Sequence, residues 1–396
     1  MTDAPAPLSR PILAGVVTAL VGFTSSFAVV LTGLSAVGAT PAQAASGLLV
    51  LSITMGLACV ILAWRYRMPI TAAWSTPGAA LLAATGVVDG GWPAATGAFL
   101  VVAALTLLAG AWTGFGGLIA RIPASIAQAM LAGVLLPLCL APVTGIAENP
   151  WGVIPVVLTW LVFARIAPRW AVPLAFVAAA IVVGVGLVRT GSPMDTSILI
   201  PRIEFVAPTF TVGALIGIAL PLFIVTMASQ NVPGVAIMRS YGYEVPWRPA
   251  MLVTGIGTAI GAPAGGHGIN LAAISAALAA SPEADPDPNR RWVAGLSTGA
   301  SYIVLGGFAA SFSALVVLAP AAVIPAVAGL ALFAAFGSAV QQAVAEPGER
   351  MPAVVTFLIA ASGISLAGIS AAFWALLAGL VVRLILTRTT TRPSEG

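Results

Sequence analysis

The sequence predicts an all-α polytopic membrane protein with 14 transmembrane segments, arranged as two inverted repeats of seven. Three observations predict this fold class. The chain is 60% hydrophobic and only 7% charged, apolar runs recur along its 396 residues, and segments three and ten are both interrupted by Gly, Pro and polar residues. A soluble globular chain carries about 25% charged residues. The mean hydropathy of +1.07 agrees with a chain that is embedded in the membrane as one unit over residues 1–396.

The apolar runs give the expected segments, because a helix needs about 20 apolar residues to span a bilayer and fewer where it is broken or re-entrant. Seven runs precede a polar loop at 189–207, namely 11–34, 41–64, 70–87, 92–112, 122–140, 151–166 and 172–188. The seven that follow it are 208–230, 249–263, 268–280, 292–312, 315–337, 352–366 and 370–386. Because each half has an odd number of segments, the second half has the opposite orientation in the membrane to the first.

The basic residues, which are all arginine, indicate the orientation. With both termini in the cytoplasm, only Arg189 and Arg202 fall outside, and the others fall inside: Arg10, Arg65, Arg67, Arg121, Arg165, Arg169, Arg239, Arg248, Arg290, Arg291, Arg350, Arg383, Arg388 and Arg392. Cytoplasmic loops carry an excess of basic residues. We therefore expect a multi-pass protein of the inner membrane, and the scattered arginines do not predict a nucleic-acid surface.

The interruption in segment three is the first part of a candidate site. Ser75 or Thr76 can cap a helix, Pro77 suits its first turn, and Gly78 removes side-chain bulk. Such a helix would begin inside the membrane, where lipid offers no partner for its free N–H groups. A bound anion can accept these hydrogen bonds, helped by the helix dipole. The alternative interpretation is a plain helix that is kinked at Pro77.

Segment ten repeats the interruption with Gly265, Gly266 and Gly268, which disfavour a continuous helix. We expect a second short helix to begin near 267–269, with Asn270 one turn into it as a hydrogen-bond donor. Matched interruptions in the two halves are typical of a transport site at the middle of the bilayer. Two half-helices whose N-termini converge there would bind a carboxylate.

His267 and Gln230 are further candidates. His267 is the only ionisable side chain that we place away from the interfaces, and histidine exchanges protons near neutral pH. Its alternative role is to stay neutral and hold the broken backbone through a hydrogen bond to a carbonyl. Gln230, near the end of segment eight, is costly in lipid unless it faces a cavity. Its alternative role is to end that helix at the cytoplasmic interface.

The sequence predicts no enzyme. Cys59 and Cys139 lie in apolar runs, where cysteine usually behaves as a small buried hydrophobe. A single histidine cannot build a His-cluster metal site, and the chain has no nucleotide-binding or hydrolase motif. We therefore expect no catalytic residue, no cofactor and no metal.

These motifs resemble the benzoate/proton symporter (BenE) family over nearly the whole chain. The resemblance rests on residues 70–81, 230–236 and 267–274. More distantly, the chain is similar to nucleobase transporters and sulfate permeases, which share a seven-plus-seven inverted-repeat fold. That fold implies a core domain of 11–112 and 208–312 and a gate domain of 122–188 and 315–386. It also implies short strands before the half-helices, and dimers are common in it, so a homodimer is an open expectation.

The resemblance implies symport of benzoate or a similar aromatic carboxylate with a proton, by an elevator-like movement of the core against the gate. The substrate-binding candidates are Ser75, Thr76, Pro77, Gly78, Gln230, Gly268 and Asn270. Trp74 and Phe27 are further candidates, which either pack on the substrate ring or make an ordinary lipid or core contact. Proton-coupled nucleobase relatives carry glutamates where this chain has Gln230 and, roughly, His267. An anionic substrate explains the difference, because a fixed carboxylate would repel it.

The proton carrier stays open between His267 and the substrate itself. The alternative function is a nucleobase or inorganic-anion carrier of the same fold. An anion channel is a weaker alternative, which non-saturating flux without counterflow would indicate.

Overall fold

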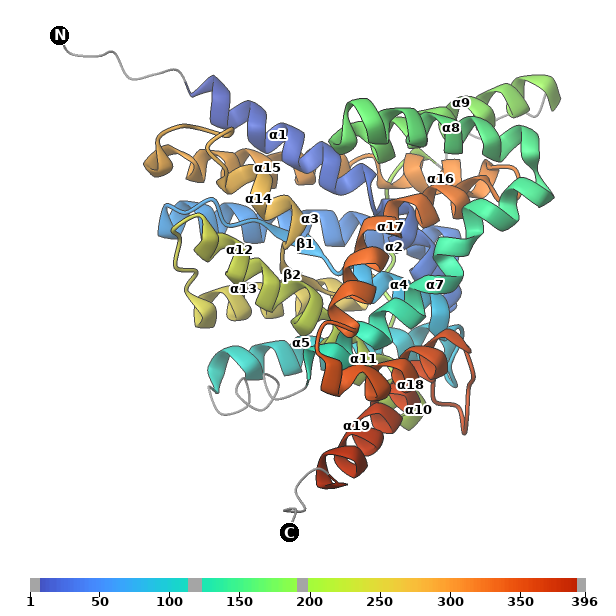
Figure 1. The fold of residues 1–396 in the computed structure, drawn as a ribbon. Helices are drawn as coiled ribbons and strands as arrows, with labels where there is room; N and C mark the ends of the chain where they lie inside the picture. The colour runs from blue at the N-terminus through green and yellow to red at the C-terminus, as the bar shows by residue number, and fades with distance from the viewer. Residues whose placement is uncertain (1–7, 113–122, 191–198, 390–396) are drawn as a thin grey trace.

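The computed structural model describes residues 8–112, 123–190 and 199–389, so Arg121, Arg392 and the first residue of the fifth expected segment lie outside the described residues. The protein is a helical bundle with the short strands β1 and β2 paired in its interior (Figure 1). The first four segments form α1 (Ser9–Thr24), α2 (Phe27–Ala36), α3 (Pro41–Tyr66), β1 (Ala72–Trp74), α4 (Thr76–Thr85) and α5 (Gly91–Ala111). The next three form α7 (Ala124–Glu148), α8 (Pro150–Ile166) and α9 (Ala171–Thr190).

The second half repeats this order. Its first four segments form α10 (Val212–Ala214), the π-helix η3 (Leu215–Ala219), α11 (Leu220–Thr226), the π-helix η4 (Met227–Asn231), α12 (Val232–Ser240), α13 (Trp247–Gly261), the 3-10 turn η5 (Ala262–Ala264), β2 (Ile269–Leu271), α14 (Ile274–Ala280), α15 (Trp292–Gly306) and α16 (Ala309–Leu318). The remainder forms α17 (Val323–Ala343), α18 (Arg350–Ala361) and α19 (Ala371–Thr389).

The helices pack in pairs that correspond between the two halves. The pair α3–α15 corresponds to α13–α5, the pair α2–α4 to α12–α14, the pair α1–α14 to α11–α4, and the pair α8–α9 to α18–α19. Each helix of one pair belongs to the segment that lies seven segments before or after the corresponding helix of the other pair. The strands β1 and β2 come one from each half and run antiparallel, with Ala73 opposite Asn270. This is the arrangement expected of two inverted repeats.

In the described residues, seven helical stretches are long and apolar enough to cross a bilayer alone, and α15 and α16 add an eighth if this pair, bent by 54°, is one span. Segments three and ten cannot pass such a test, because α4 has ten residues and α14 has seven. The count of 14 segments stays a prediction.

The predicted end of segment eight at Gln230 is wrong, because the helix continues through α12 to Ser240. The π-helices η3 and η4 each end two residues before a proline, Pro221 and Pro233. A proline lacks the N–H that would bond four residues back, and its ring clashes with that carbonyl. The wider π turn accommodates the missing bond, so the helix passes each proline without ending.

The predicted boundary between segments eleven and twelve, at 312–315, is also wrong because it lies inside α16. The chain instead breaks after Gly306 and again at 319–322, before α17. Residues 309–318 are mostly apolar, with only Ser311 and Ser313 as polar residues, and hold no Gly or Pro. Hydropathy alone therefore could not place the junction.

Candidate functional site

The strands β1 and β2 lie in the interior of the bundle, and their outer edges are hydrogen-bonded to side chains of neighbouring elements. The acceptors are Cys59 Sγ for Ala72 N–H at 3.0 Å, Thr258 Oγ1 for Ile269 N–H at 3.0 Å, and Asn231 Oδ1 for Leu271 N–H at 2.9 Å. Unpaired strand edges are unfavourable in a membrane protein because lipid cannot pair them. Cys59 is therefore a partner of the strand as well as the buried small side chain that the sequence predicted.

Helix α4 begins directly after β1, as the interruption in segment three predicted. Ser75 is its N-cap: the Ser75 hydroxyl accepts the Gly78 N–H at 3.1 Å and lies 2.7 Å from Thr226 Oγ1 on α11. The Ser75 N–H donates to the Gly268 carbonyl at 3.1 Å. A Cβ at Gly78 would collide with Leu222, so this glycine allows α4 and α11 to approach closely. The polar groups of Ser75 are thus occupied by the protein itself.

Segment ten differs from its prediction. Its half-helix α14 begins at Ile274 and not near 267–269, and Asn270 lies on β2. Gly268 has a φ of +149°, a conformation that favours glycine, and it precedes the strand. The Asn270 amide donates to the Leu271 carbonyl at 3.1 Å, and its oxygen is buried with no partner in the described residues. The extended backbone of 269–271 forms because it pairs with β1, which the sequence of segment ten alone does not reveal.

His267 is fully buried and lies beside this pairing. Its Nε2 is 2.9 Å from the Ser75 carbonyl oxygen. Its ring also meets the ring of Phe99 on α5 edge-on, with a centroid distance of 6.3 Å. The hydrogen bond to a carbonyl is the contact that the alternative interpretation of His267 required, and His267 is not among the residues that line the cavity described next.

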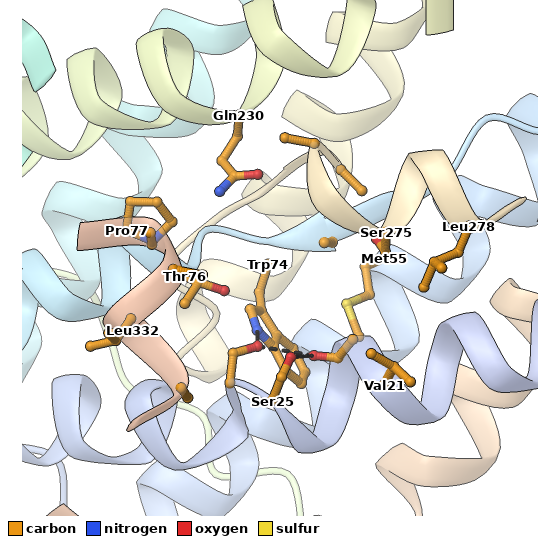
Figure 2. A pocket seen from close by; sticks show the side chains of 18 of the residues that line it. Val21, Ser25, Met55, Trp74, Thr76, Pro77, Gln230, Ser275, Leu278 and Leu332 are labelled. Atoms are coloured by element: carbon orange, nitrogen blue, oxygen red, sulfur yellow. Dashed lines mark hydrogen bonds between the residues drawn. The ribbon is translucent and has the colours of Figure 1, made fainter. Parts of the chain in front are cut away.

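A cavity of about 130 Å³ lies beside the start of α4. Figure 2 shows the amide of Gln230 and the hydroxyl of Thr76 pointing into a space that Trp74 also borders. The apolar wall is formed by Met55, Leu135, Leu278 and Leu332 together with several alanines. Sites for drug-sized ligands enclose roughly 300–1,000 Å³. The cavity therefore has room for a small molecule of about one ring.

Four of the predicted site residues, Trp74, Thr76, Pro77 and Gln230, line this cavity, and the others do not. Ser75, Gly78, Gly268, Asn270 and His267 form the backbone support behind it. Phe27 lies in an aromatic cluster behind Trp74, with ring centroids 4.6 Å from Phe176 and 4.8 Å from Phe312, and Phe23 connects it to Trp74. This is the core contact that the sequence left open for Phe27.

Other lining residues were not predicted as site residues. Ser26 accepts the Trp74 indole N–H at 2.8 Å, and this bond fixes the orientation of the ring. Ser275 on α14 and Tyr302 on α15 add hydroxyl groups to the wall. Ser26 belongs to a polar patch in segment one that the sequence does show, but no sequence signal distinguishes Tyr302 from an ordinary core residue.

The lining residues, all of which the structure describes, include no Asp, Glu, Lys, Arg or His. Any positive electrostatic potential at the cavity wall therefore comes from backbone N–H groups. The N–H groups at the first turn of α4 form the positive end of that helix. Ser75 caps Gly78, and Ala79 N–H bonds to the Ser75 carbonyl. The Thr76 N–H, at the first residue of α4, has no hydrogen bond among the described residues.

Comparison with known proteins agrees with this architecture. The family model described as "Benzoate membrane transport protein" matches residues 6–385. The chain belongs to the benzoate membrane transport protein family. The chain is similar to "Inner membrane protein YdcO" of Escherichia coli (strain K12), with 38% identity over 95% of each chain. It is also similar to the "Benzoate membrane transport protein" of Acinetobacter baylyi (strain ATCC 33305 / BD413 / ADP1), with 32% identity over 85% of each chain.

Solved structures show the fold of this benzoate transport family member. The transmembrane domain of the cyanobacterial bicarbonate transporter BicA matches with a TM-score of 0.59 at 15% identity, covering 97% of this chain and 98% of that one. Murine Slc26a9, an anion transporter in the inward-facing state, matches with a TM-score of 0.60 at 15% identity, covering 99% of this chain and 70% of that one. The chain is thus a multi-span membrane transporter with an inverted-repeat fold, and its family and fold are not those of enzymes.

Proposed function

We propose that this transporter carries benzoate or a similar aromatic carboxylate together with a proton across the inner membrane. The observation that supports it most strongly is the cavity, which joins a free helix N-terminus at Thr76 to an apolar slot of one-ring size. A carboxylate can accept the Thr76 N–H and hydroxyl, while Gln230 donates from the other side. The ring then lies against Trp74 and Leu332. The name of the Acinetobacter baylyi relative supports the same substrate class.

The position of the cavity supports an elevator-like mechanism. Leu135 on α7 and Leu332 on α17 belong to the proposed gate domain of 122–188 and 315–386. Trp74, Thr76 and Gln230 belong to the proposed core domain of 11–112 and 208–312. A substrate in the cavity would therefore touch both domains, and a movement of the core against the gate would carry it across. The scattered arginines support cytoplasmic termini, and the name of the E. coli relative supports the inner membrane.

The cavity is also suited to a proton-coupled anion. It has no fixed carboxylate to repel the substrate and no fixed cation to hold it too tightly. A carboxylate that crosses with one proton carries no net charge, which lowers the cost of moving it through the membrane interior. His267, one hydrogen bond away from the start of α4, is the proposed proton carrier.

The test is uptake of radiolabelled benzoate into proteoliposomes, with and without an inward proton gradient. We expect saturable uptake that the gradient stimulates and that shows counterflow. Excess unlabelled aromatic carboxylates should compete, whereas nucleobases, chloride and sulfate should not. Competition by nucleobases or inorganic anions would favour the alternative carrier. Non-saturating flux without counterflow would indicate a channel and would overturn the proposal.

A further inference from the structure

The Ser75–Thr76 peptide group lies between His267 and the cavity. A carbonyl oxygen can only accept a hydrogen bond, so the His267 Nε2 that lies 2.9 Å from the Ser75 oxygen must carry the hydrogen. The N–H of the same peptide group belongs to Thr76, which lines the cavity. In a trans peptide the carbonyl and the N–H point in opposite directions. One rigid group therefore presents its oxygen to the histidine and its N–H to the proposed carboxylate.

The second ring nitrogen of His267 is free to take a proton. A neutral imidazole that donates from Nε2 has a bare Nδ1, and this Nδ1 is buried with no partner in the described residues. A proton on Nδ1 would create a positive charge in a fully buried site. Such a charge is strongly unfavourable unless an opposite charge compensates it.

Ionisable groups on the described elements around His267 do not supply that compensation. Gly47 of α3 packs against Gly265, so Arg65 and Tyr66 at the end of α3 lie about 27 Å further along the helix, at 1.5 Å per residue. By the same rise, Arg248 lies about 15 Å from Thr258 along α13. Asp89 precedes Gly91, the start of α5, which itself lies about 12 Å from Phe99 along the helix. The remaining groups are Cys59, whose sulfur is bonded to Ala72, and the exposed Arg202 and Glu204.

We propose that the Ser75–Thr76 peptide couples proton binding at His267 to carboxylate binding in the cavity. A carboxylate that accepts the Thr76 N–H polarises the peptide, makes the Ser75 oxygen a stronger acceptor and stabilises the protonated histidine. Hydrogen bonds in a chain strengthen one another in this way. The coupling is reciprocal, so a proton on Nδ1 makes Thr76 N–H a stronger donor to the substrate. His267 is thus a positioning residue that does not touch the substrate, and one carboxylate binds with one proton.

This inference rests on the proposed function and is tested by calorimetry. Benzoate is titrated into the purified full-length protein at pH 7, in buffers that differ in ionisation enthalpy, so that the slope gives the protons taken up. Carboxyl groups ionise near pH 4, so benzoate itself enters as the anion. We expect uptake of about one proton per benzoate by the wild type, and an affinity that falls by up to about tenfold per pH unit at high pH.

Two variants isolate the coupling. His267→Gln keeps an amide donor for the Ser75 oxygen but cannot be protonated, and it should bind benzoate with no proton uptake and a flat pH profile. Thr76→Val keeps the peptide N–H and loses the hydroxyl, and it should bind more weakly but still take up about one proton.

The outcomes separate this inference from the proposed function. Proton uptake by His267→Gln equal to that of the wild type overturns the inference. Benzoate binding by the wild type without proton uptake also overturns the inference. This second measurement does not depend on the folding of any variant. In both cases the substrate assignment stands. A wild-type protein that binds no aromatic carboxylate at all overturns the proposed function instead.

Discussion

The side-chain oxygens of Ser75 and Thr226 lie 2.7 Å apart, so the first turn of α4 is hydrogen-bonded to the end of α11. Ser75 comes from the first repeat and Thr226 from the second. The same Ser75 oxygen caps the Gly78 N–H. This contact attaches α4, the half-helix that borders the cavity, to α11, which continues into η4 with the cavity-lining Gln230.

Loss of the Ser75 hydroxyl should destabilise this junction. Ser75→Ala removes both the N-cap and the bond to Thr226, and the loss of a cap costs about 0.5–2 kcal/mol. We expect a lower melting temperature in detergent and weaker benzoate binding. Thr226→Val removes only the inter-helix bond and leaves the cap, so its melting temperature should fall less. If the melting temperature of Thr226→Val falls as much as that of Ser75→Ala, or falls more, the cap does not dominate the stability of this junction.

Gln230→Glu should disrupt transport through charge. A carboxylate beside the proposed site would repel an anionic substrate, and the amide donor would be lost as well. Because a hydrogen bond to a charged group contributes about 1.5–3 kcal/mol, we expect the KM for benzoate to rise by about tenfold or more. Gln342→Glu adds the same charge at an exposed position near the end of α17 and is the matched control. Similar KM values for the two variants would place the substrate elsewhere.

Leu332 should limit the size of the substrate ring. It is almost fully buried in α17 and lines the cavity together with Thr76 and Trp74. Leu332→Ala should raise uptake of a bulkier acid such as naphthoate relative to benzoate, by about tenfold, since small changes in an apolar pocket alter selectivity by roughly 10–200-fold.

Leu358→Ala, at an exposed position on α18, is the control for Leu332→Ala. Each variant should be compared only after its melting temperature is measured, because a buried Leu→Ala change costs about 2–5 kcal/mol. An unchanged ratio of naphthoate to benzoate uptake in Leu332→Ala would contradict the proposed ring position.

Cys59 should matter as a hydrogen-bond acceptor. Cys59→Val fills a similar volume but leaves the Ala72 N–H of β1 unpaired, at a cost of about 1–3 kcal/mol. Cys59→Ser keeps an acceptor and should retain more of the wild-type melting temperature. Cys139→Val, on α7 and outside the strand pair, is the control and should have the smallest effect. A stable Cys59→Val protein would show that the strand edge tolerates the missing partner.

Local chemistry explains which parts of the site could be predicted. The run from Ser75 to Gly78 carries a cap, a first-turn proline and a small residue in order, and it forms the expected half-helix. Segment ten has no such cap, since α14 begins after Ala273 with no side-chain hydrogen bond. The sequence therefore predicts the start of this half-helix too early and predicts a helix at Asn270, which lies on a strand.

The sequence by itself determined that this chain is an inverted-repeat membrane protein with interrupted segments in both halves. Composition, the charge bias and backbone-breaking residues are local properties that act wherever the chain lies. Only the tertiary structure decided which polar groups face the cavity. Ser75 is bonded to Thr226, and His267 is bonded to the Ser75 carbonyl. Thr76 and Gln230 line the cavity, and the Thr76 N–H and the Gln230 amide have no hydrogen-bond partner among the described residues. That division depends on partners 151 and 192 residues away in the chain, which no local pattern specifies.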